Sequence, residues 1–456
     1  MKPGQFLKRA WLPVLAALLL LSACSAPVAP TAAPGEPPAA AATQSSGGGS
    51  APAATAPPAA AEPTAAASLP DPLPLELVAQ GITVAYNDTV HYGFLVRNPN
   101  PSHAVQNSTF TATFYDANRA VLGTDDLSAI ELVLPGQTVG VADGLWLDDP
   151  AVASMSIELT SGEPVVFTET LLPYEIVSTS ECVTEGFQAV RAEIVSPYAA
   201  NVILPRISVI YYDADGKISG GGSGYRAGLL ANGKTGVLIF GAKSVNTVRY
   251  EVYTGYRGLP AMVAQPPSDA KPLQVSAQGF TQAGNYLTYD VILENPNGAY
   301  LLDQSLLSVN AYAADGSFLG GEPMPLVSVL PGQKLGISRQ FGLCDETPVD
   351  HIEVAVSAGD YIPSQQTAYF GSENVTLQDG AVSGELVNLA GIDLKVFYAT
   401  AIVYDAAGQV IGGGSLTVDA LAAGGRASVQ IPVTVNGTPA RAEIFGVLTR
   451  KSLPQQ

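Results

Sequence analysis

"FYDANRAVLG", residues Phe114–Gly123, is the first of four versions of one ten-residue stretch. The other three are "YYDADGKISG" (Tyr211–Gly220), "AYAADGSFLG" (Ala311–Gly320) and "VYDAAGQVIG" (Val403–Gly412). Their shared tyrosines, at positions 115, 212, 312 and 404, are 97, 100 and 92 residues apart. Such regular spacing indicates an internal repeat, in which one folding unit recurs along the chain.

Two further landmarks keep the same spacing from the tyrosines. A break in the apolar pattern comes 17 or 18 residues before each one, as in "RNPNP" at Arg97 and "ENPN" at Glu294. A turn glycine comes 20 or 21 residues after it, at Gly136, Gly233, Gly332 and Gly424. We therefore predict four repeats, over residues 71–173, 174–262, 271–363 and 367–450.

The residues before each tyrosine alternate as a half-buried β-strand does. Phe110, Ala112 and Phe114 fall on one face, which we predict to be the core face, and threonines fall on the other. Tyr115 and its equivalents point away from the core, and we expect their hydroxyls to lie in water.

The Asp-Gly and Ala-Gly pairs that follow predict a tight hairpin, because glycine supplies the positive φ that such a turn demands. In the first repeat, where this glycine is missing, we expect Asn118 to take the positive φ.

Each repeat is expected to hold six or seven strands, with turns every 8–12 residues. The predicted fold class is all-β: four tandem antiparallel β-sandwich repeats.

The pattern strand–"YDADG"–strand, with "NP" before it and "LPG" after it, resembles the FxLYD-type repeat of exported bacterial proteins. The resemblance covers nearly all of residues 71–450 and implies an immunoglobulin-like sandwich. Four residues depart from it where the family has its leading phenylalanine: Ala112, Val209, Val309 and Ala401. The resemblance implies fold and export rather than a particular activity.

The first residues have the pattern of an export signal. Basic Lys2, Lys8 and Arg9 precede an apolar run at Trp11–Leu21, which is too short to span a bilayer comfortably. The following "LSAC", ending at Cys24, resembles the lipobox of bacterial lipoproteins. This resemblance implies that residues 1–23 are a signal peptide, that Cys24 is lipidated, and that the membrane is a partner through this anchor. We expect an exported protein on the outer face of the cell membrane or on the cell surface.

Residues 24–70 consist mostly of Ala, Pro, Thr, Ser and Gly. Since such a segment has too few apolar side chains to offset the entropy cost of ordering, we predict a disordered tether. The formal net charge of the whole chain is −19, which argues against nucleic acid as a partner.

Candidate chemical sites have simpler explanations. The "DADG" at Asp213–Gly216 is similar to the opening of a calcium loop, but lysine, isoleucine, serine and glycine follow where further ligands should be. Glycine runs such as Gly412–Gly414 lack the lysine of a phosphate-binding loop and suggest a bulge or an edge strand instead. Adjacent carboxylates at Asp125–Asp126 and Asp148–Asp149 are interpreted as solvated loop charge.

The histidines, His91, His103 and His351, are not spaced as metal ligands. No nucleophile with a suitably placed base is visible either. We expect no catalytic residues, no metal and no cofactor, and hence no enzyme.

Cys182 and Cys344 are the cysteines left after Cys24, in a compartment that allows disulfides. We expect Cys182 near the end of the first strand of its repeat and Cys344 after the fifth strand of the next. In a straight head-to-tail rod they would lie about a domain apart, too far for a bond. Either the repeats fold back on each other and the two cysteines pair, or both thiols are free and buried.

Two functions fit this sequence. The first is a non-catalytic, lipid-anchored surface protein whose repeats form a binding, adhesive or spacer scaffold for an unknown surface or extracellular ligand. The alternative is a specific ligand receptor, carbohydrate-binding or transport-associated, with a site between neighbouring repeats. The tyrosine-rich Tyr250–Tyr256 is the first candidate for that site.

Overall fold

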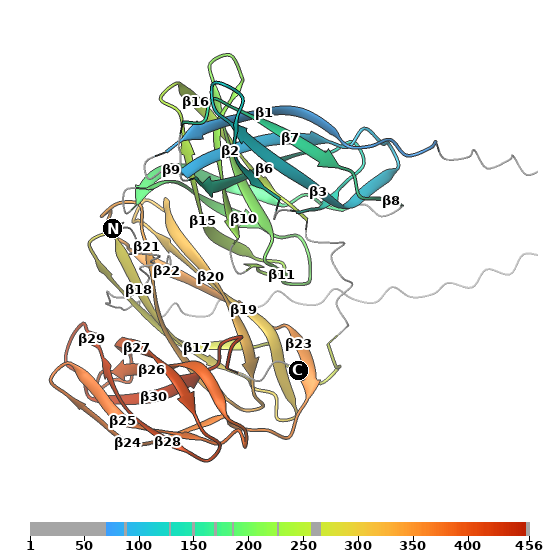
Figure 1. Ribbon diagram of the computed structural model, residues 1–456. Helices are drawn as coiled ribbons and strands as arrows, with labels where there is room; N and C mark the ends of the chain where they lie inside the picture. The colour runs from blue at the N-terminus through green and yellow to red at the C-terminus, as the bar shows by residue number, and fades with distance from the viewer. Residues whose placement is uncertain are drawn as a thin grey trace, which may run out of the picture. The chain divides into compact units, whose positions relative to one another are not determined.

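The computed structural model describes residues 70–85, 89–126, 129–147, 151–167, 171–184, 187–225, 228–256 and 266–452. Every helix or strand assigned within them is a β-strand, and the paired strands are antiparallel (Figure 1), which confirms the all-β fold class. None of these described residues forms a helix suited to crossing a membrane. Residues 1–69, with the predicted signal peptide, Cys24 and nearly all of the tether, lie outside the described part.

The first repeat has eight strands in two sheets. One sheet has the order β1-β2-β6, and in the other β3 is flanked by β4 and β5 on one side and by β7 and β8 on the other. The strands are β1 (Glu76–Val84), β2 (Thr89–Arg97), β3 (His103–Tyr115), β4 (Val121–Asp125), β5 (Ala129–Val133), β6 (Thr138–Trp146), β7 (Ser154–Thr160) and β8 (Glu163–Val166).

The second repeat has the same strands, but its two sheets join into one of order β16-β12-β13-β15-β10-β9, because the end of β15 crosses to pair with β13. Its strands are β9 (Glu175–Thr184), β10 (Phe187–Val195), β11 (Val202–Ile203), β12 (Arg206–Asp213), β13 (Ile218–Tyr225), β14 (Gly228–Leu229), β15 (Lys234–Lys243) and β16 (Thr247–Thr254).

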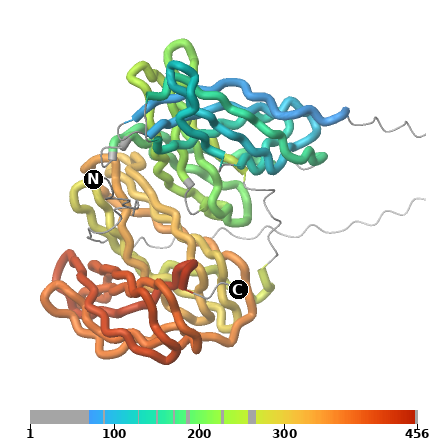
Figure 2. Tube along the Cα trace, viewed as in Figure 1, coloured from blue at the N-terminus to red at the C-terminus, as the bar shows by residue number. Residues whose placement is uncertain are grey.

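The third and fourth repeats follow the same plan, and Figure 2 traces the chain from the first repeat in blue to the fourth in red. The third repeat has β17 (Gln274–Ala283), β18 (Tyr286–Glu294), β19 (Tyr300–Tyr312), β20 (Phe318–Val329), β21 (Lys334–Gly342), β22 (His351–Ser357) and β23 (Asp360–Pro363). The fourth has β24 (Phe370–Gln378), β25 (Ala381–Asn388), β26 (Leu394–Tyr404), β27 (Val410–Leu421), β28 (Arg426–Pro432), β29 (Thr434–Val435) and β30 (Arg441–Val447).

One topology describes all four repeats when the six main strands are lettered A to F in chain order. Strands A, B and E form one sheet, which we call the ABE sheet; in the third repeat these are β17, β18 and β21. Strands D, C and F form the other, the DCF sheet; in the third repeat these are β20, β19 and β22 with β23. Some strands are broken into two pieces, which accounts for the extra short strands: D and F in the first repeat, C and D in the second, F in the third and E in the fourth.

Each repeat has its own apolar core between its two sheets. In the first repeat Phe110, Ala112 and Phe114 are buried in this core, as the alternating pattern predicts. Phe94 and Tyr92 of strand B face them, with the Phe94 and Phe110 rings 4.7 Å apart in an edge-to-face arrangement.

In three of the four repeats the hairpin turn is closed by the aspartate that follows the motif tyrosine; Ala313 replaces it in the third. The Oδ1 atom of Asp213 accepts hydrogen bonds from the N–H groups of Asp215 (3.0 Å) and Lys217 (2.9 Å). Gly216 has a φ of 77°, as predicted. In the first repeat the residue in the same turn position is Arg119, with a φ of 67°, so the prediction that Asn118 takes the positive φ is wrong.

In the first, third and fourth repeats a buried asparagine ties the break before strand C to the rest of the sandwich, while Ser196 stands at this position in the second. The Nδ2 of Asn98 donates to the carbonyl oxygens of His103 (2.8 Å) and Val133 (3.0 Å). Asn295 and Asn388 make the corresponding bonds in the third and fourth repeats. The side chain therefore joins the B–C turn to the end of strand D, a role that the sequence pattern alone did not reveal.

The positive φ in the hairpin gives a test of the turn. Gly216→Val should destabilise the protein by about 1–3 kcal/mol, because a β-branched side chain is strained at this φ. Arg119→Gly, at the same position of the first repeat, should stabilise it by about 1 kcal/mol, because it relieves a left-handed non-glycine residue. Urea unfolding of both variants measures this, and a neutral Gly216→Val would contradict the turn assignment.

Candidate functional site

The outer faces of the sandwiches pack on one another in a constant order. The ABE sheet of each repeat packs on the DCF sheet of the next. Thus β1, β2 and β6 contact β12 and β13; β10 and β15 contact β20; and β17, β18 and β21 contact β27. We call these three contacts the 1–2, 2–3 and 3–4 joints. They are the surfaces on which an inter-repeat site would have to lie.

At two joints an aromatic ring lies against a glycine. A Cβ built on Gly140, in strand E of the first repeat, would overlap the ring of Tyr253 from strand F of the second. A Cβ on Gly336 of the third repeat would overlap the ring of Phe445 of the fourth in the same way. Since only glycine leaves room for a ring flat against the backbone, these glycines allow the sheets to approach closely.

The 2–3 joint has a related contact. The equivalent glycine, Gly236, lies against the Phe318 ring and the Asn310 side chain, and its N–H donates to Asn310 Oδ1 at 2.8 Å. A glycine at this register of strand E is thus common to the first three repeats, whereas the ring that covers it comes from different strands.

The repeated tyrosines lie in the joints rather than in water. Tyr212, Tyr312 and Tyr404 are 3%, 5% and 4% exposed, so the expectation of solvated hydroxyls is wrong for these three. Their hydroxyls donate to Glu251 (3.1 Å), Glu193 (2.6 Å) and Glu443 (3.1 Å). Burial raises the pKa of each phenol above its usual value.

Tyr115 is the exception, because no repeat covers the DCF sheet of the first repeat in the described chain. It is partly exposed, and its hydroxyl lies 3.1 Å from that of Ser156. The same motif residue is therefore buried or exposed according to whether another repeat packs on its sheet.

The 1–2 and 3–4 joints each have an apolar centre, although the Arg206–Asp143 ion pair (3.4 Å) crosses the first and the buried Asp290 lies in the second. Each contains a separate cluster of buried residues, distinct from the cores of the sandwiches. The 1–2 cluster holds Ala142, Ile210, Tyr212 and Ile218, and the 3–4 cluster holds Ile292, Ile402, Tyr404 and Val410.

The 2–3 joint is polar instead. Glu193, only 5% exposed, lies there within 3.3 Å of Lys234 Nζ and accepts the Tyr312 hydroxyl bond. Lys234 also pairs with Glu353 at 2.9 Å, and its ammonium lies 4.7 Å from the centre of the Tyr312 ring. Charges and hydroxyls thus replace the aliphatic side chains found at the other two joints.

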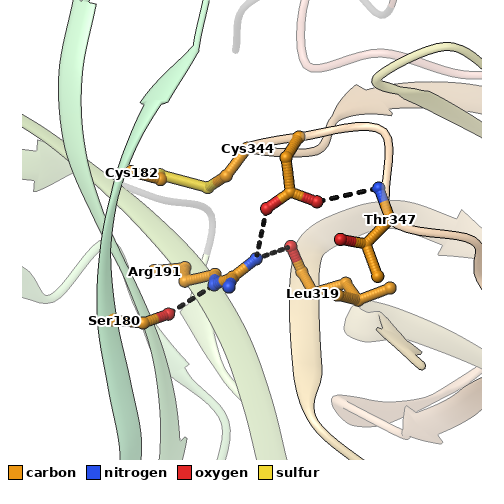
Figure 3. Close-up of a disulfide and its surroundings, with 7 residues drawn as sticks. Ser180, Cys182, Arg191, Leu319, Cys344 and Thr347 are labelled. Carbon is orange, nitrogen blue, oxygen red and sulfur yellow. Dashed lines mark hydrogen bonds and ion pairs between the residues drawn. A yellow bond between two sulfur atoms is a disulfide. The ribbon is translucent and has the colours of Figure 1, made fainter. Parts of the chain in front are cut away.

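A disulfide crosses this polar joint (Figure 3). Cys182 lies in β9, the first strand of the second repeat, and Cys344 follows β21, the fifth strand of the third, as the sequence predicts. The two cysteines are bonded, with a Cα–Cα distance of 5.3 Å. The argument that a rod would separate them does not apply, because the second and third repeats pack face to face.

Arg191 also links the second and third repeats beside the disulfide. Its Nη1 donates to the carbonyl oxygen of Leu319 (3.3 Å) in the third repeat and lies 3.9 Å from Asp345 Oδ2, while its Nε donates to Ser180 (Figure 3). Hydrogen bonds from Thr347, and then the Arg191 charge, hold the pKa of Asp345 below its usual value. Asp345 thus carries its charge beside the disulfide.

The tyrosines predicted as a ligand site are used in packing. Tyr253 covers Gly140, Tyr250 donates to Thr179 Oγ1 at 3.1 Å, and the Tyr256 ring lies 5.2 Å from that of Tyr174. A hollow of about 240 Å³ lies beside Cys182, between Tyr211 and Lys243. It is smaller than the roughly 300–1,000 Å³ of typical ligand pockets.

The remaining sequence candidates occupy structural positions. Asp125 is 8% exposed and accepts a hydrogen bond from Tyr92 at 2.8 Å, so its interpretation as solvated charge is wrong. Asp148–Asp149 lie outside the described residues. His91 lies in the 1–2 joint beside Gly144, where burial lowers its pKa. Within the described ranges, no cluster of three or more His, Cys, Asp or Glu residues is arranged to bind a metal ion.

Asp290 is a buried carboxyl that sequence reasoning missed. It lies on the outer face of β18 and is fully buried against Gly413 of the fourth repeat. Burial raises its pKa to about 7, although the Ser338 hydroxyl acts in the opposite direction. The equivalent positions in the first two repeats are Gly93 and Arg191, so no repeat pattern marks this residue.

No protein-family model matches the chain, and no curated protein matches it. Among solved structures, alpha-2-macroglobulin of Escherichia coli activated by porcine elastase is 11% identical with a TM-score of 0.12, over 83% of this chain and 44% of that one. Dimeric latent PorU of Porphyromonas gingivalis is 9% identical with a TM-score of 0.13, over 64% of this chain and 33% of that one. The chain thus spans less than half the length of either protein, and likeness at this level establishes no common fold.

Asp290 should make stability depend on pH. Because the folded protein raises its pKa from 3.8 to about 7, the folded state binds the proton more tightly than the unfolded state does. Stability should therefore fall as pH rises from about 4 to about 7, by up to roughly 4 kcal/mol, and level off above. Asp290→Asn should be more stable than wild type at pH 8 and similar to it at pH 4.

Urea unfolding at the two pH values measures this effect. The exposed Asp215→Asn is the matched control and should change little at either pH. An Asp290→Asn variant that is less stable than wild type at pH 8 would show that the carboxylate is stabilised in the joint.

The disulfide predicts how the chain behaves when it is cut. Proteolysis between β16 and β17 should give two fragments that remain joined until a reductant is added. Cys182→Ser with Cys344→Ser should give fragments that separate without reductant. Gel electrophoresis with and without reductant distinguishes these cases, and wild-type fragments that separate under oxidising conditions would refute the bond.

Proposed function

We propose that the protein is a non-catalytic scaffold, anchored by a lipid at Cys24 to the outer face of a cell membrane. The observation that carries the scaffold part is the packing of the joints. Rings on glycines and buried clusters occupy the surfaces between repeats, where a receptor would need an open concave site. Such filled joints suit a spacer or presenting surface better than a ligand receptor.

Anchoring and export are supported by two independent features. The first is the sequence "LSAC" after a basic and apolar leader, which is similar to a lipobox. The second is the Cys182–Cys344 disulfide, because disulfides persist in oxidising compartments outside the cytoplasm. Attachment through two or three acyl chains would be firm, at roughly 0.8 kcal/mol for each buried methylene.

The scaffold would act by holding a surface away from the membrane. Residues 25–70, if coil-like, would add an average spacing of roughly 35–40 Å. The packed repeats would then present their outer strands to the surroundings, where adhesion or binding of an extracellular ligand would take place.

Replacing the anchor cysteine tests the proposal. Cys24→Ser should move the protein from the membrane fraction to the soluble fraction and abolish labelling by a fatty-acid probe. Cys182→Ser with Cys344→Ser is the matched control and should leave the protein in the membrane fraction. Wild-type protein that is not labelled by the fatty-acid probe would refute lipid anchoring at Cys24.

A further inference from the structure

The two outermost sheet faces of the described repeats carry no neighbouring repeat. One is the DCF face of the first repeat, on β3 and β7, and the other is the ABE face of the fourth repeat, on β25 and β28. Every other ABE face in the described chain packs on a DCF face. The two faces are therefore the places where a second copy of this chain could extend the stack head to tail.

The face of the first repeat lacks the ring that covers a glycine. In the second repeat Tyr253 pairs with Ser208 of strand C, and in the fourth Phe445 pairs with Thr400. The corresponding pair in the first repeat is Thr111 with Glu158. An exposed carboxylate thus stands where the 1–2 and 3–4 joints have an aromatic ring.

A nearby position on strand C of the first repeat is also polar where the joints have an apolar residue. Ile210 and Ile402, each two residues before the motif tyrosine, are fully buried in the 1–2 and 3–4 joints. Thr113 stands at that position in the first repeat and remains partly exposed. The face has therefore lost the ring and the isoleucine, although it keeps Tyr115 and the exposed Val121, which correspond to Tyr212 and Ile218 of the 1–2 joint.

The face of the fourth repeat lacks the matching glycine. Gly140 pairs with Leu95 across strands B and E, and Gly336 pairs with Ile292. In the fourth repeat this pair is Ser428 with Glu385. Arg426 lies beside it, 3.4 Å from Glu385 and also paired with Glu373.

We infer that these two faces are caps that prevent one copy of the chain from stacking on another. In the geometry of the 1–2 joint, Tyr253 lies over Gly140, beside Leu95. A copy docked in the same way would place Glu158 over Ser428, beside Glu385. Glu158 and the Arg426-paired Glu385 would both be desolvated, at the positions where the 1–2 joint has Tyr253 and Leu95.

Each of the two faces has a polar residue at the position where a joint has its contact residue, and this distinguishes them from ordinary polar surface. The ring is missing on the first repeat and the glycine on the fourth, so each terminal face lacks its own half of the contact. Terminal repeats with a polar outer face are what a stacked array requires in order to remain soluble.

The test restores each half separately, in the full chain carrying Cys24→Ser so that lipid does not drive association. The ring variant carries Glu158→Phe and Thr113→Ile, and the glycine variant carries Ser428→Gly and Glu385→Ile. Sedimentation velocity should show each variant as a monomer alone and a one-to-one dimer when the two are mixed. A single chain with all four substitutions should form larger assemblies as concentration rises.

Three results would overturn the inference: wild-type chains that already assemble end to end, a mixture that stays monomeric, or a ring variant that assembles without its partner. Since all four positions lie on outer faces, folding should be preserved, and thermal melting checks it. A milder pair, Glu158→Tyr with Ser428→Gly, should give a weaker dimer if the ring-on-glycine contact drives the docking.

Discussion

The arrangement of this chain depends on one constraint: two β-sheets can pack flat only where side chains leave room. At Gly140 and Gly336 the room is made by the absence of a Cβ, and a ring from the next repeat fills it. Glycine in a strand interior costs stability, because it has no side chain to pack and loses more backbone entropy than other residues. Its presence at the same register in three successive repeats is explained by the contact that it permits.

The packing of one repeat on the next also explains why the motif tyrosine recurs. The hairpin requires Asp213 and Gly216 for its turn, but nothing in the turn requires Tyr212. The ring is instead buried against the preceding repeat, with its hydroxyl bonded to a glutamate on strand F and an arginine stacked over it, as Arg249 lies 3.8 Å above Tyr212. One motif therefore combines two demands, a turn within its own sandwich and a joint to the preceding one.

The sequence allowed the sandwiches to be predicted but not the joints. Alternation identified Phe110 and Phe114 as core residues because the inner face of a strand is uniformly apolar. The outer face has no uniform pattern of this kind. Tyr212 has an apolar ring and a polar hydroxyl, so its burial cannot be inferred from residue type, and Gly140 resembles any other glycine in a strand. The stretches LPGQTVG, LANGKTG and LPGQKLG align Gly140, Gly236 and Gly336, but only the structure shows that these glycines, opposite Leu95, Glu193 and Ile292, face the next repeat. For the same reason the sequence could not show that the tyrosine hydroxyls and Asp125 are buried, and both were predicted to lie in water.

The location of the disulfide follows from the difference between the joints. The 1–2 and 3–4 joints each bury a cluster of aliphatic side chains, which stabilises contact without matched charge, although the Arg206–Asp143 pair and Asp290 also lie in these joints. The 2–3 joint buries Glu193 with Lys234 and Tyr312, and the attraction in such a pair is largely offset by the loss of hydration. A covalent bond across that joint keeps the two halves at high effective concentration, so that modest polar contacts suffice to hold them together. The chain is therefore best understood as two pairs of repeats, each closed by apolar contact and joined to the other by Cys182–Cys344.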